Sequence, residues 1–306
     1  MNWFFIALVA PFLWAIVNIA DNYLVAKFSV KDKEKSSGGL VLFSSLIGIV
    51  IALFIWFFVQ DVWNVSGPDK LLLLLSGTLT IIWIILYLFA LEIEDTSLVV
   101  PWFLAVPVFG YVLGALFLGE SLTSNQLLGS VVIFFGLIII SFDWRKDKKI
   151  FKKKPALYML FASFAIALSG VLFKYVTIEG DFWVSSFWEY LGLGITGIFI
   201  YTLMPHYRSS FHNMNKSGGY KIFSVNIISE LMSISGNILT NFALLLAPAA
   251  MVFLVGSFQP AIVLVLTVVG TRFLPHIIKE DISSGVLVPK IAGILVMTFG
   301  SVILFI

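Results

Sequence analysis

The chain has 306 residues, of which 60% are hydrophobic and only 12% are charged, and its formal net charge at pH 7 is +2. An ordinary soluble domain has roughly a quarter charged residues, so this composition predicts an integral membrane protein and excludes a soluble or nucleic-acid-binding domain. The sequence holds no cysteine, and its histidines, His206, His212 and His276, fall in polar loops without helical pairing. We therefore expect no disulfide, no metal site and no cofactor.

Apolar segments follow one another along the whole chain, each close to the length of about 20 residues that a helix needs to cross the hydrocarbon core. The first lacks a preceding basic region and a small-residue cleavage site, so we expect a retained span and not a signal peptide. The ten predicted spans cover residues 2–24, 39–60, 70–91, 97–118, 125–142, 156–177, 182–203, 222–246, 248–270 and 286–306. The predicted fold class is all-α and membrane-integral.

A basic stretch, DWRKDKKIFKKKP at residues 143–155, divides these spans into five and five. We interpret it as a linker between a first repeat, residues 1–142, and a second repeat, residues 156–306. Each half carries an alanine seventeen positions before a proline and then two glycines seven positions apart. These landmarks are Ala90, Pro107, Gly129 and Gly136 in the first half and Ala243, Pro260, Gly293 and Gly300 in the second.

The repeat also predicts how the two halves are oriented in the membrane and where their helices are kinked. Because each half has an odd number of spans, the second copy must enter the membrane from the opposite side, as in the inverted repeats of secondary transporters. Pro107 and Pro260 lie inside equivalent predicted spans, where a proline frees a backbone carbonyl and kinks the helix. Broken helices often flank transporter binding sites, but these kinks could also serve only to shape the bundle.

The run ALEIEDTSLVVPWFLAVPVFGYVLGALFLGESLTSNQLLGSVVIFFGLII, residues 90–139, resembles the closing part of an EamA-type repeat of the drug/metabolite transporter superfamily. The second half repeats it more loosely as ALLLAPAAMVFLVGSFQPAIVLVLTVVG and KIAGILVMTFGSVIL. The resemblance implies ten helices around a central cavity, with the fifth and tenth packed outside. The sequence departs from the family where Trp14 precedes Ala15 in place of glycine, and where Glu189 replaces an arginine of the seventh helix. Substrate assignments tied to those positions are therefore not transferred.

The distribution of basic residues predicts the orientation. All of the 19 Lys and Arg residues except Lys70 and Lys174 fall in or beside the loops after the first, fifth, seventh and ninth spans. By the positive-inside rule these odd-numbered loops are cytoplasmic, which places both termini outside. Alternatively, the basic linker is an exposed tether whose charges are merely tolerated.

Three predicted helices carry polar or amphipathic stripes at steps of three and four, and such a stripe stays on one face of a helix. Ionisable side chains inside a membrane usually face a wet cavity, although serine and asparagine faces also join helices by hydrogen bonding. The stripes are Trp14, Asn18, Asp21 and Asn22; Ser76, Thr80, Trp83 and Tyr87; and Glu230, Ser233, Asn237 and Asn241. We expect them to line the cavity, and the candidate substrate-binding residues are Trp14, Asn18, Trp83, Tyr87, Trp102, Glu230, Asn237 and Gln259.

Some of these residues have further predicted roles and alternatives. Trp102 is expected to close the inner end of the site. Glu230 has no obvious basic neighbour, so a proton that it takes up and releases could couple transport to a proton gradient, and Asp21 is a second candidate for this role. Asp21 could instead sit at the membrane interface. Lys174 and Glu189 lie toward the same face of the membrane, so a structural ion pair is favoured over a role in substrate binding.

The charge inside the spans restricts the substrate. Phosphorylated solutes need Arg or Lys to hold phosphate, and the spans contain little basic charge. Acidic and aromatic residues suit cationic, zwitterionic or neutral amphiphilic solutes such as amino acids, amines or quaternary ammonium compounds. We therefore predict a secondary transporter of a small metabolite that works by alternating access as a monomer in the cell membrane and is not an enzyme.

Two alternatives remain at this point. A lipid-headgroup flippase would share the fold, and the sequence does not separate it from a transporter. An integral-membrane enzyme is disfavoured, because the tightest acidic cluster, Glu92, Glu94 and Asp95, has no histidine near it in the sequence. The chain has no GxxxxGK[ST] motif, so direct use of ATP is not expected.

Overall fold

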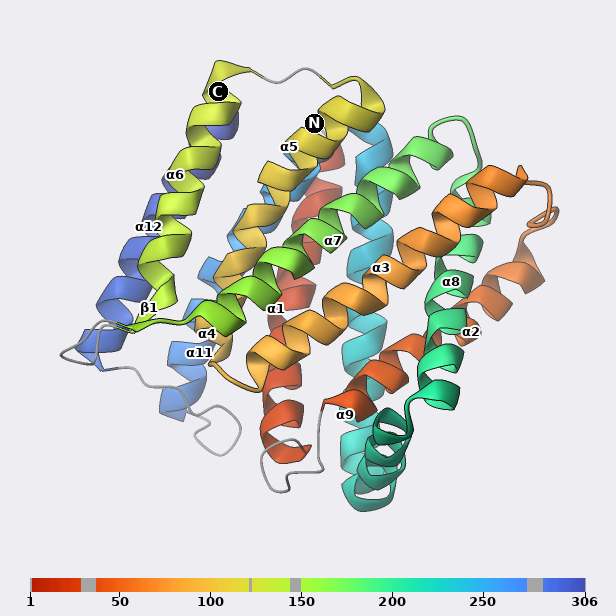
Figure 1. The fold of residues 1–306 in the computed structure, drawn as a ribbon, viewed down its shortest axis with the longest axis horizontal. Coiled ribbons are helices and arrows are strands. Elements are labelled where there is room, and N and C mark those ends of the chain that lie inside the picture. Colours follow the sequence, from red (N-terminus) through yellow and green to blue (C-terminus); the bar gives the residue numbers. More distant parts are fainter. Residues whose placement is uncertain (1, 29–36, 121–122, 144–149, 274–282, 306) are drawn as a thin grey trace.

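A computed structural model describes residues 2–28, 37–120, 123–143, 150–273 and 283–305 (Figure 1). Nearly all of them are helical. The helices are α1 (Asn2–Phe28), α2 (Gly38–Phe58), α3 (Gly67–Leu91), α4 (Thr96–Val99), the 3-10 helix η1 (Val100–Ala105), α5 (Val106–Leu118), α6 (Ser124–Ser141), α7 (Lys153–Thr177), α8 (Phe182–Leu203), α9 (Pro205–Leu246), α10 (Ala249–Val255), the 3-10 helix η2 (Gly256–Phe258), α11 (Gln259–Phe273) and α12 (Ser284–Phe305). The strands β1 (Phe142–Asp143) and β2 (Ile150–Phe151) form one short antiparallel pair.

Helix covers the described part of each predicted span, and the all-α class is confirmed. Within the described residues, 7 helical segments are long and apolar enough to cross a membrane, or up to 8 if a bent pair counts as one span. Many large apolar side chains on their outer faces are exposed, as lipid contact requires. The chain is therefore a multi-pass integral membrane protein.

The segment between α8 and the membrane-spanning part of α9 is helical, whereas the sequence predicted a polar loop there. Residues Pro205–Lys216 form a helix bent by 101° from α8. It ends near Gly219, whose φ of 61° and ψ of −174° break the helix before the span begins. The prediction was wrong because a helix with one apolar side can pack on the bundle end: Phe211 and Met214 contact the core while His206 and His212 stay exposed.

Two spans are interrupted at the predicted prolines. The first runs as α4, η1 and α5, and Pro107 is the second residue of α5. The other runs as α10, η2 and α11, and Pro260 is the second residue of α11. Proline lacks an N–H group and fits best in the first turn of a helix, so in each span an α-helix begins again at the proline after a 3-10 segment.

Helix packing is paired across the two halves. When α1, α2, α3, α5 and α6 are matched with α7, α8, α9, α11 and α12, several of the large contacts have counterparts. These are α3 with α7 and α1 with α9, α3 with α8 and α2 with α9, and α5 with α7 and α1 with α11. The contacts of α2 with α8 and of α6 with α12 map onto themselves.

α6 and α12 stand side by side at one edge of the molecule (Figure 1). Their backbones touch at the predicted glycines. A Cβ atom on Gly136 would lie 2.9 Å from the carbonyl oxygen of Gly293, and one on Gly300 would lie 2.9 Å from that of Gly129. The start of α1 and the end of α12 lie at the same end of the bundle, opposite the β1–β2 pair (Figure 1).

Candidate functional site

A cavity of about 140 Å³ lies between the two halves. This is roughly ten times the space that one ordered water needs, so the cavity can hold a small solute. Its walls come from α1, α2, α3, η1 and α5 of the first half and from α7, α9, α10, η2 and α11 of the second. The polar and aromatic residues that line it include Trp14, Asn18, Asp21, Ser44, Thr80, Trp83, Tyr87, Phe103, Ser169, Asn226, Ser229, Glu230, Ser233, Asn237, Thr240, Asn241, Phe253 and Gln259.

A hydrogen-bond chain crosses one wall and joins the halves. The side-chain amide of Gln259 donates to Asn18 Oδ1 at 2.7 Å, and Asn18 Nδ2 donates to the hydroxyl oxygen of Tyr87 at 2.8 Å. The hydroxyl of Tyr87 in turn is hydrogen-bonded to the carboxyl of Asp21. Helices α11, α1 and α3 are thus connected by side chains that are buried or half-buried yet reach the cavity. Each of these four side chains has a hydrogen-bond partner, as buried polar groups require.

Two carboxyl groups face this cavity. Glu230 on α9 accepts a hydrogen bond from the hydroxyl of Ser44 on α2. Asp21 on α1 lies close enough to Glu230 for the two carboxyls to interact electrostatically. None of the described residues that line the cavity is Lys, Arg or His. The cavity therefore offers acceptors for a cation and no positive partner for an anion.

Aromatic rings form the neighbouring wall. Trp83 lies 6.1 Å from Phe103 in an edge-to-face arrangement and 6.2 Å from Tyr87, and Tyr87 lies 5.6 Å from Phe103. Trp14 of α1 donates its indole N–H to the backbone carbonyl of Ser233 at 3.4 Å. Rings placed next to carboxyls are suited to hold an ammonium group by cation–π contact.

Trp102 does not lie where the sequence predicted. It is buried outside the main cavity and lines a small separate cleft beside Glu94 and Lys152. Its carbonyl accepts a hydrogen bond from Ser163. The reason is the 3-10 turn of η1, in which neighbouring side chains are about 120° apart, so that Phe103 and not Trp102 faces the cavity.

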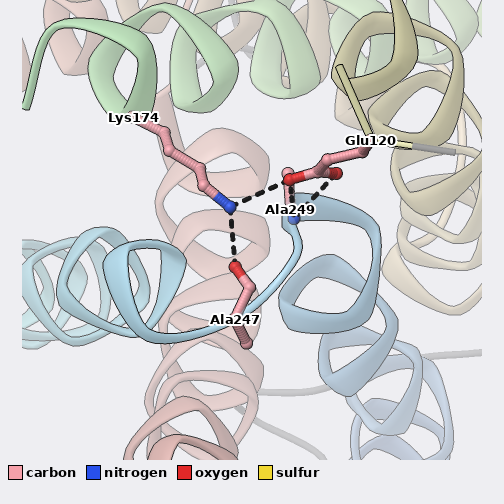
Figure 2. Close-up of polar contacts among 4 residues, drawn as sticks. All are labelled: Glu120, Lys174, Ala247 and Ala249. Atoms are coloured by element: carbon pink, nitrogen blue, oxygen red, sulfur yellow. Dashed lines mark hydrogen bonds and ion pairs between the residues drawn. The ribbon is translucent and has the colours of Figure 1, made fainter. Parts of the chain in front are cut away.

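The predicted ion pair between Lys174 and Glu189 is also wrong. Figure 2 shows that Lys174 instead donates to Glu120 Oε1 at 2.9 Å and to the carbonyl of Ala247 at 2.8 Å. The N–H of Ala249 donates to both oxygens of Glu120, at 3.1 and 3.3 Å. We call Lys174, Glu120, Ala247 and Ala249 the end cluster; it joins α5 to α7 and to the connection between α9 and α10.

The end cluster depends on the turn that follows α5. Gly119 ends this helix with φ of 66° and ψ of 20°, a left-handed conformation that glycine adopts without strain. The turn brings the next residue, Glu120, back beneath the helix, where its N–H donates to the carbonyl of Gly114. Its carboxylate then faces the second half. Glu189, by contrast, accepts hydrogen bonds from Ser76 and Asn241.

Several cavity residues were not predicted. Ser44 interrupts an apolar span, and this polar position was the available signal for its contact with Glu230. Asn226 and Ser229 continue the predicted stripe of α9 by one further turn. Phe253 gives no signal in the sequence, because a phenylalanine in a span is ordinarily lipid-facing or core. Its place in the wall follows from the close approach of its ring to Gly110 and Gly170.

The remaining predicted positions are placed as follows. Lys290, assigned to a loop by the sequence, is buried in α12 and donates to the hydroxyl of Ser97. The salt bridge between Lys152 and Glu94, at 2.5 Å, ties the end of the linker to the connection between α3 and α4. His276 and residues 144–149 of the linker lie outside the described residues.

Comparison with known proteins gives a family for this chain. Residues 1–142 match the EamA-like transporter family. A protein of Escherichia coli (strain K12) named "Probable amino-acid metabolite efflux pump" is 33% identical over 162 residues, and its namesake from Salmonella typhimurium is 32% identical over 158 residues. These alignments cover 48% and 47% of this chain, and the chain spans about half the length of both relatives, 51% and 50%.

Two further likenesses extend the comparison. "Uncharacterized protein MJ1333.1" of Methanocaldococcus jannaschii is 30% identical over 97 residues, which are 32% of this chain and 71% of that protein. A solved structure titled "Crystal structure of protein" covers 99% of this chain and 96% of its own, with a TM-score of 0.56 and 13% identity. That likeness shows that the whole chain has a fold already observed in a crystal.

Proposed function

Because the chain belongs to the EamA-like transporter family, we propose that it is a secondary transporter of a small solute that carries an amine, either a cation or a zwitterion such as an amino acid. The observation that carries this proposal is the charge of the cavity. Asp21 and Glu230 face it, while no described lining residue is basic. A phosphorylated solute would meet only negative charge there, whereas an ammonium group would meet two carboxyls and an aromatic wall.

The proposed mechanism is alternating access by two inverted halves of five spans each, with residues 1–142 and 156–306 as the repeats. The paired helix contacts support this plan, since the matching of α1–α6 with α7–α12 accounts for them. The cavity lies between the halves, where the sites of such carriers are found. In this proposal the basic loops lie on the cytoplasmic side, and both ends of the chain lie on the opposite side of the membrane.

Alternating access requires a barrier at each end of the cavity in turn. In this proposal the end cluster is part of the barrier on the side where α1 begins, because Glu120 follows the first half's α5 while Lys174, Ala247 and Ala249 belong to the second half. When that end opens, the bond between Lys174 and Glu120 has to break or move with both helices. While that end is closed, the bonds of the end cluster hold the end of α5 against α7 and against the connection between α9 and α10.

The names of the two bacterial relatives favour amino-acid-like solutes and export. The aligned part is about half of each relative, so this preference rests on the shared family and on the cavity charge together. A zwitterion needs a partner for its carboxylate as well as for its ammonium group. The amide of Asn237 and the hydroxyl of Ser233 are among the neutral donors in the cavity wall, next to the amides of Asn18 and Gln259 that already bond within the hydrogen-bond chain.

The test is the thermal stability of the detergent-purified chain against a panel of amino acids, polyamines, choline-like compounds and sugar phosphates. A ligand that binds the folded state raises the melting temperature by mass action. We expect an amine or an amino acid to stabilise the wild type and to lose most of this effect in Glu230→Gln. Glu179→Gln is the matched control, because Glu179 is an exposed carboxylate between α7 and α8. Stabilisation by sugar phosphates, or an equal shift in Glu230→Gln, would contradict the proposal.

A further inference from the structure

We propose that Glu189 is the residue that binds the coupling proton, so that the cavity carboxyls are left to hold the solute. The inference rests on the proposed transport function and adds to it a second acidic site behind the cavity wall. It follows from three observations: the burial of Glu189, the neutral partners of its carboxyl group, and a row of hydroxyl groups that connects it with the cavity.

Glu189 lies on α8 at the place where this helix touches α3. Its side chain is sealed from solvent, with 2% of the residue exposed. The seal is made by glycines: Gly77 of α3 packs against the backbone carbonyl of Glu189, and Gly192 of α8 packs against the backbone of Leu74. A larger residue at either glycine would push the helices apart, so the carboxyl sits in a tightly closed junction.

The partners of the carboxyl group are neutral. Ser76 Oγ lies 3.0 Å from Glu189 Oε1, and Asn241 Nδ2 donates to Glu189 Oε2 at 2.8 Å. Among the described residues, no basic side chain forms an ion pair with Glu189. An ionised carboxylate buried without a countercharge is strongly unfavourable, and such a group ordinarily neutralises by taking up a proton.

The titratable groups on the surrounding helices do not change this balance. On α7, Lys174 is bonded to Glu120, and on α3, Lys70 lies over the ring of Trp188 at 5.2 Å from its centre. α2 carries no titratable residue. On α8 itself, Tyr190 is within electrostatic reach of both Glu189 and Glu230 of α9. None of these described groups is a positively charged partner of Glu189.

Hydroxyl groups lead from Glu189 to the cavity. Ser76 Oγ lies 2.9 Å from Ser169 Oγ, and Ser169 Oγ lies 3.4 Å from Thr80 Oγ1. Ser169 and Thr80 line the cavity, whereas Ser76 and Glu189 lie behind them. In the proposed step the O–H bond of Glu189 breaks, Ser76 accepts that proton and passes its own to Ser169, and Ser169 releases one to water in the cavity. Each hydroxyl ends with one proton, and Glu189 ends as a carboxylate.

Asn241 provides a second link between the two sites. Its amide donates to Glu189, and it also belongs to the stripe of α9 that faces the cavity with Glu230 and Asn237. Between Glu189 and a solute bound to this stripe, Asn241 is therefore the connecting side chain. Loss of the proton from Glu189 would strengthen its bond with Asn241, because a charged acceptor forms the stronger hydrogen bond, and would so bias the position of α9.

The same geometry argues against a sodium ion as the coupling ion. Ser76 Oγ already lies at hydrogen-bonding distance from Ser169 Oγ and from Glu189 Oε1, which leaves no gap for a cation between Ser76 and either of them. The other carboxylate oxygen faces the N–H donor of Asn241, and a metal ligand set consists of acceptors. A proton needs no such space.

The first test requires no solute. Infrared difference spectra of the purified full chain, recorded across a pH titration, report the carbonyl stretch of protonated carboxylic acids. We expect Glu189→Gln to lose one titrating component that Glu230→Gln retains. Glu120→Gln is the matched control, since Glu120 is a half-buried carboxylate already paired with a lysine, and its removal should leave the protonated-acid band unchanged. An unchanged band in Glu189→Gln would overturn the proposal.

A second variant tests the connection to the cavity. Ser169→Ala removes the central hydroxyl and leaves Glu189 and its neighbour Ser76 in place. In heavy water, the shift of the Glu189 band that reports exchange of its proton for deuterium should be slower in this variant than in the wild type. Ser235→Ala is the control, because Ser235 is exposed on α9 and its hydroxyl bonds its own helix. Equal exchange rates in Ser169→Ala and wild type would contradict the hydroxyl path.

The third test links the proton to transport. Proteoliposomes holding the full chain receive a radiolabelled mixture of the standard L-amino acids, with either a pH gradient or excess unlabelled mixture inside. We expect Glu189→Gln to retain exchange of labelled for unlabelled solute and to lose accumulation driven by the pH gradient. Accumulation equal to that of the wild type, or accumulation that depends on a sodium gradient, would overturn the proposal. If the wild type moves none of the mixture, the proposed solute class fails while the infrared test still decides the role of Glu189.

Discussion

Glu120 and Glu189 are both acids at the junction of the two halves, Glu120 half-buried and Glu189 sealed from solvent, and their surroundings give them different properties. Glu120 faces an ammonium group and a backbone N–H, and both of its oxygens accept hydrogen bonds from the end cluster. Glu189 faces a hydroxyl and an amide. The first carboxylate has a positively charged partner. The second has only neutral partners, so its charge can change while the neighbouring side chains stay in place.

The comparison teaches that the partner of a carboxylate in a transporter decides whether the acid is structural or switchable. A paired charge fixes the geometry of the helices that provide it, and removal of one member leaves the other uncompensated. A neutral network tolerates either form of the acid, because hydroxyl groups can donate or accept. Variants that change one partner at a time therefore separate the two situations.

The largest effect is expected for Lys174→Met. This change leaves Glu120 without its cation in a place with little solvent, and breaking a buried pair in this way costs about 3–5 kcal/mol of unfolding free energy. Thermal and denaturant unfolding in detergent would measure the loss, and the double variant Lys174→Met, Glu120→Gln should recover much of it. Lys70→Met is the control, since its contact with Trp188 is worth only about 0.5–1 kcal/mol at an accessible site. Equal losses of unfolding free energy in Lys174→Met and Lys70→Met would show that the ion pair of Lys174 with Glu120 stabilises the fold no more than the contact of Lys70 with Trp188.

A smaller effect is expected for Glu120→Gln, and it should exceed that of Glu189→Gln. The amide at position 120 loses the charge-assisted bonds with Lys174 and Ala249, which are worth about 1.5–3 kcal/mol. The amide at position 189 resembles the protonated acid in shape and can still bond to Ser76 and Asn241, so we expect a loss below about 1 kcal/mol. The same unfolding measurement serves both. The reverse order would mean that Glu189 is the structural acid.

An effect smaller than that of Glu120→Gln is expected for Ala249→Pro, which removes one backbone donor to Glu120. Ala249 is the first residue of α10, where proline is accommodated. The preceding Pro248 has φ of −53° and ψ of 140°, which suits a residue before proline. The missing hydrogen bond should cost about 1 kcal/mol, and the ring also has to fit at a position where Ala249 is fully buried. Ala249→Ser keeps the N–H and should match the wild type. A loss as large as that of Lys174→Met would show that the turn itself is disturbed.

Much of the cavity wall could be predicted from the sequence because it depends on local periodicity. Steps of three and four place Glu230, Asn237 and Asn241 on one face of a regular helix, and α9 is regular through these residues. The halves could be aligned through their prolines because each proline restarts a helix at an equivalent point. In both cases the information is contained in a short stretch of chain.

Pairings between distant helices could not be predicted in the same way. Lys174 and Glu189 are near in the sequence and lie toward one face of the membrane, but the partner of Lys174 is decided by the turn at Gly119 in the other half. Trp102 was misplaced because a 3-10 segment changes the angle between successive side chains. In both cases the outcome depends on a departure from regular helix that composition does not reveal.

The glycine contact between α6 and α12 has a consequence for biosynthesis. A ribosome delivers the chain from its N-terminus, so α6 enters the membrane well before its partner has been made. Its glycine face, built for the backbone of α12, has to remain in lipid or against a provisional neighbour while α7 to α11 are synthesised. The first half is thus held incomplete until α12 arrives, and a quality-control factor that recognises bare glycine faces in the bilayer would find its target in this interval.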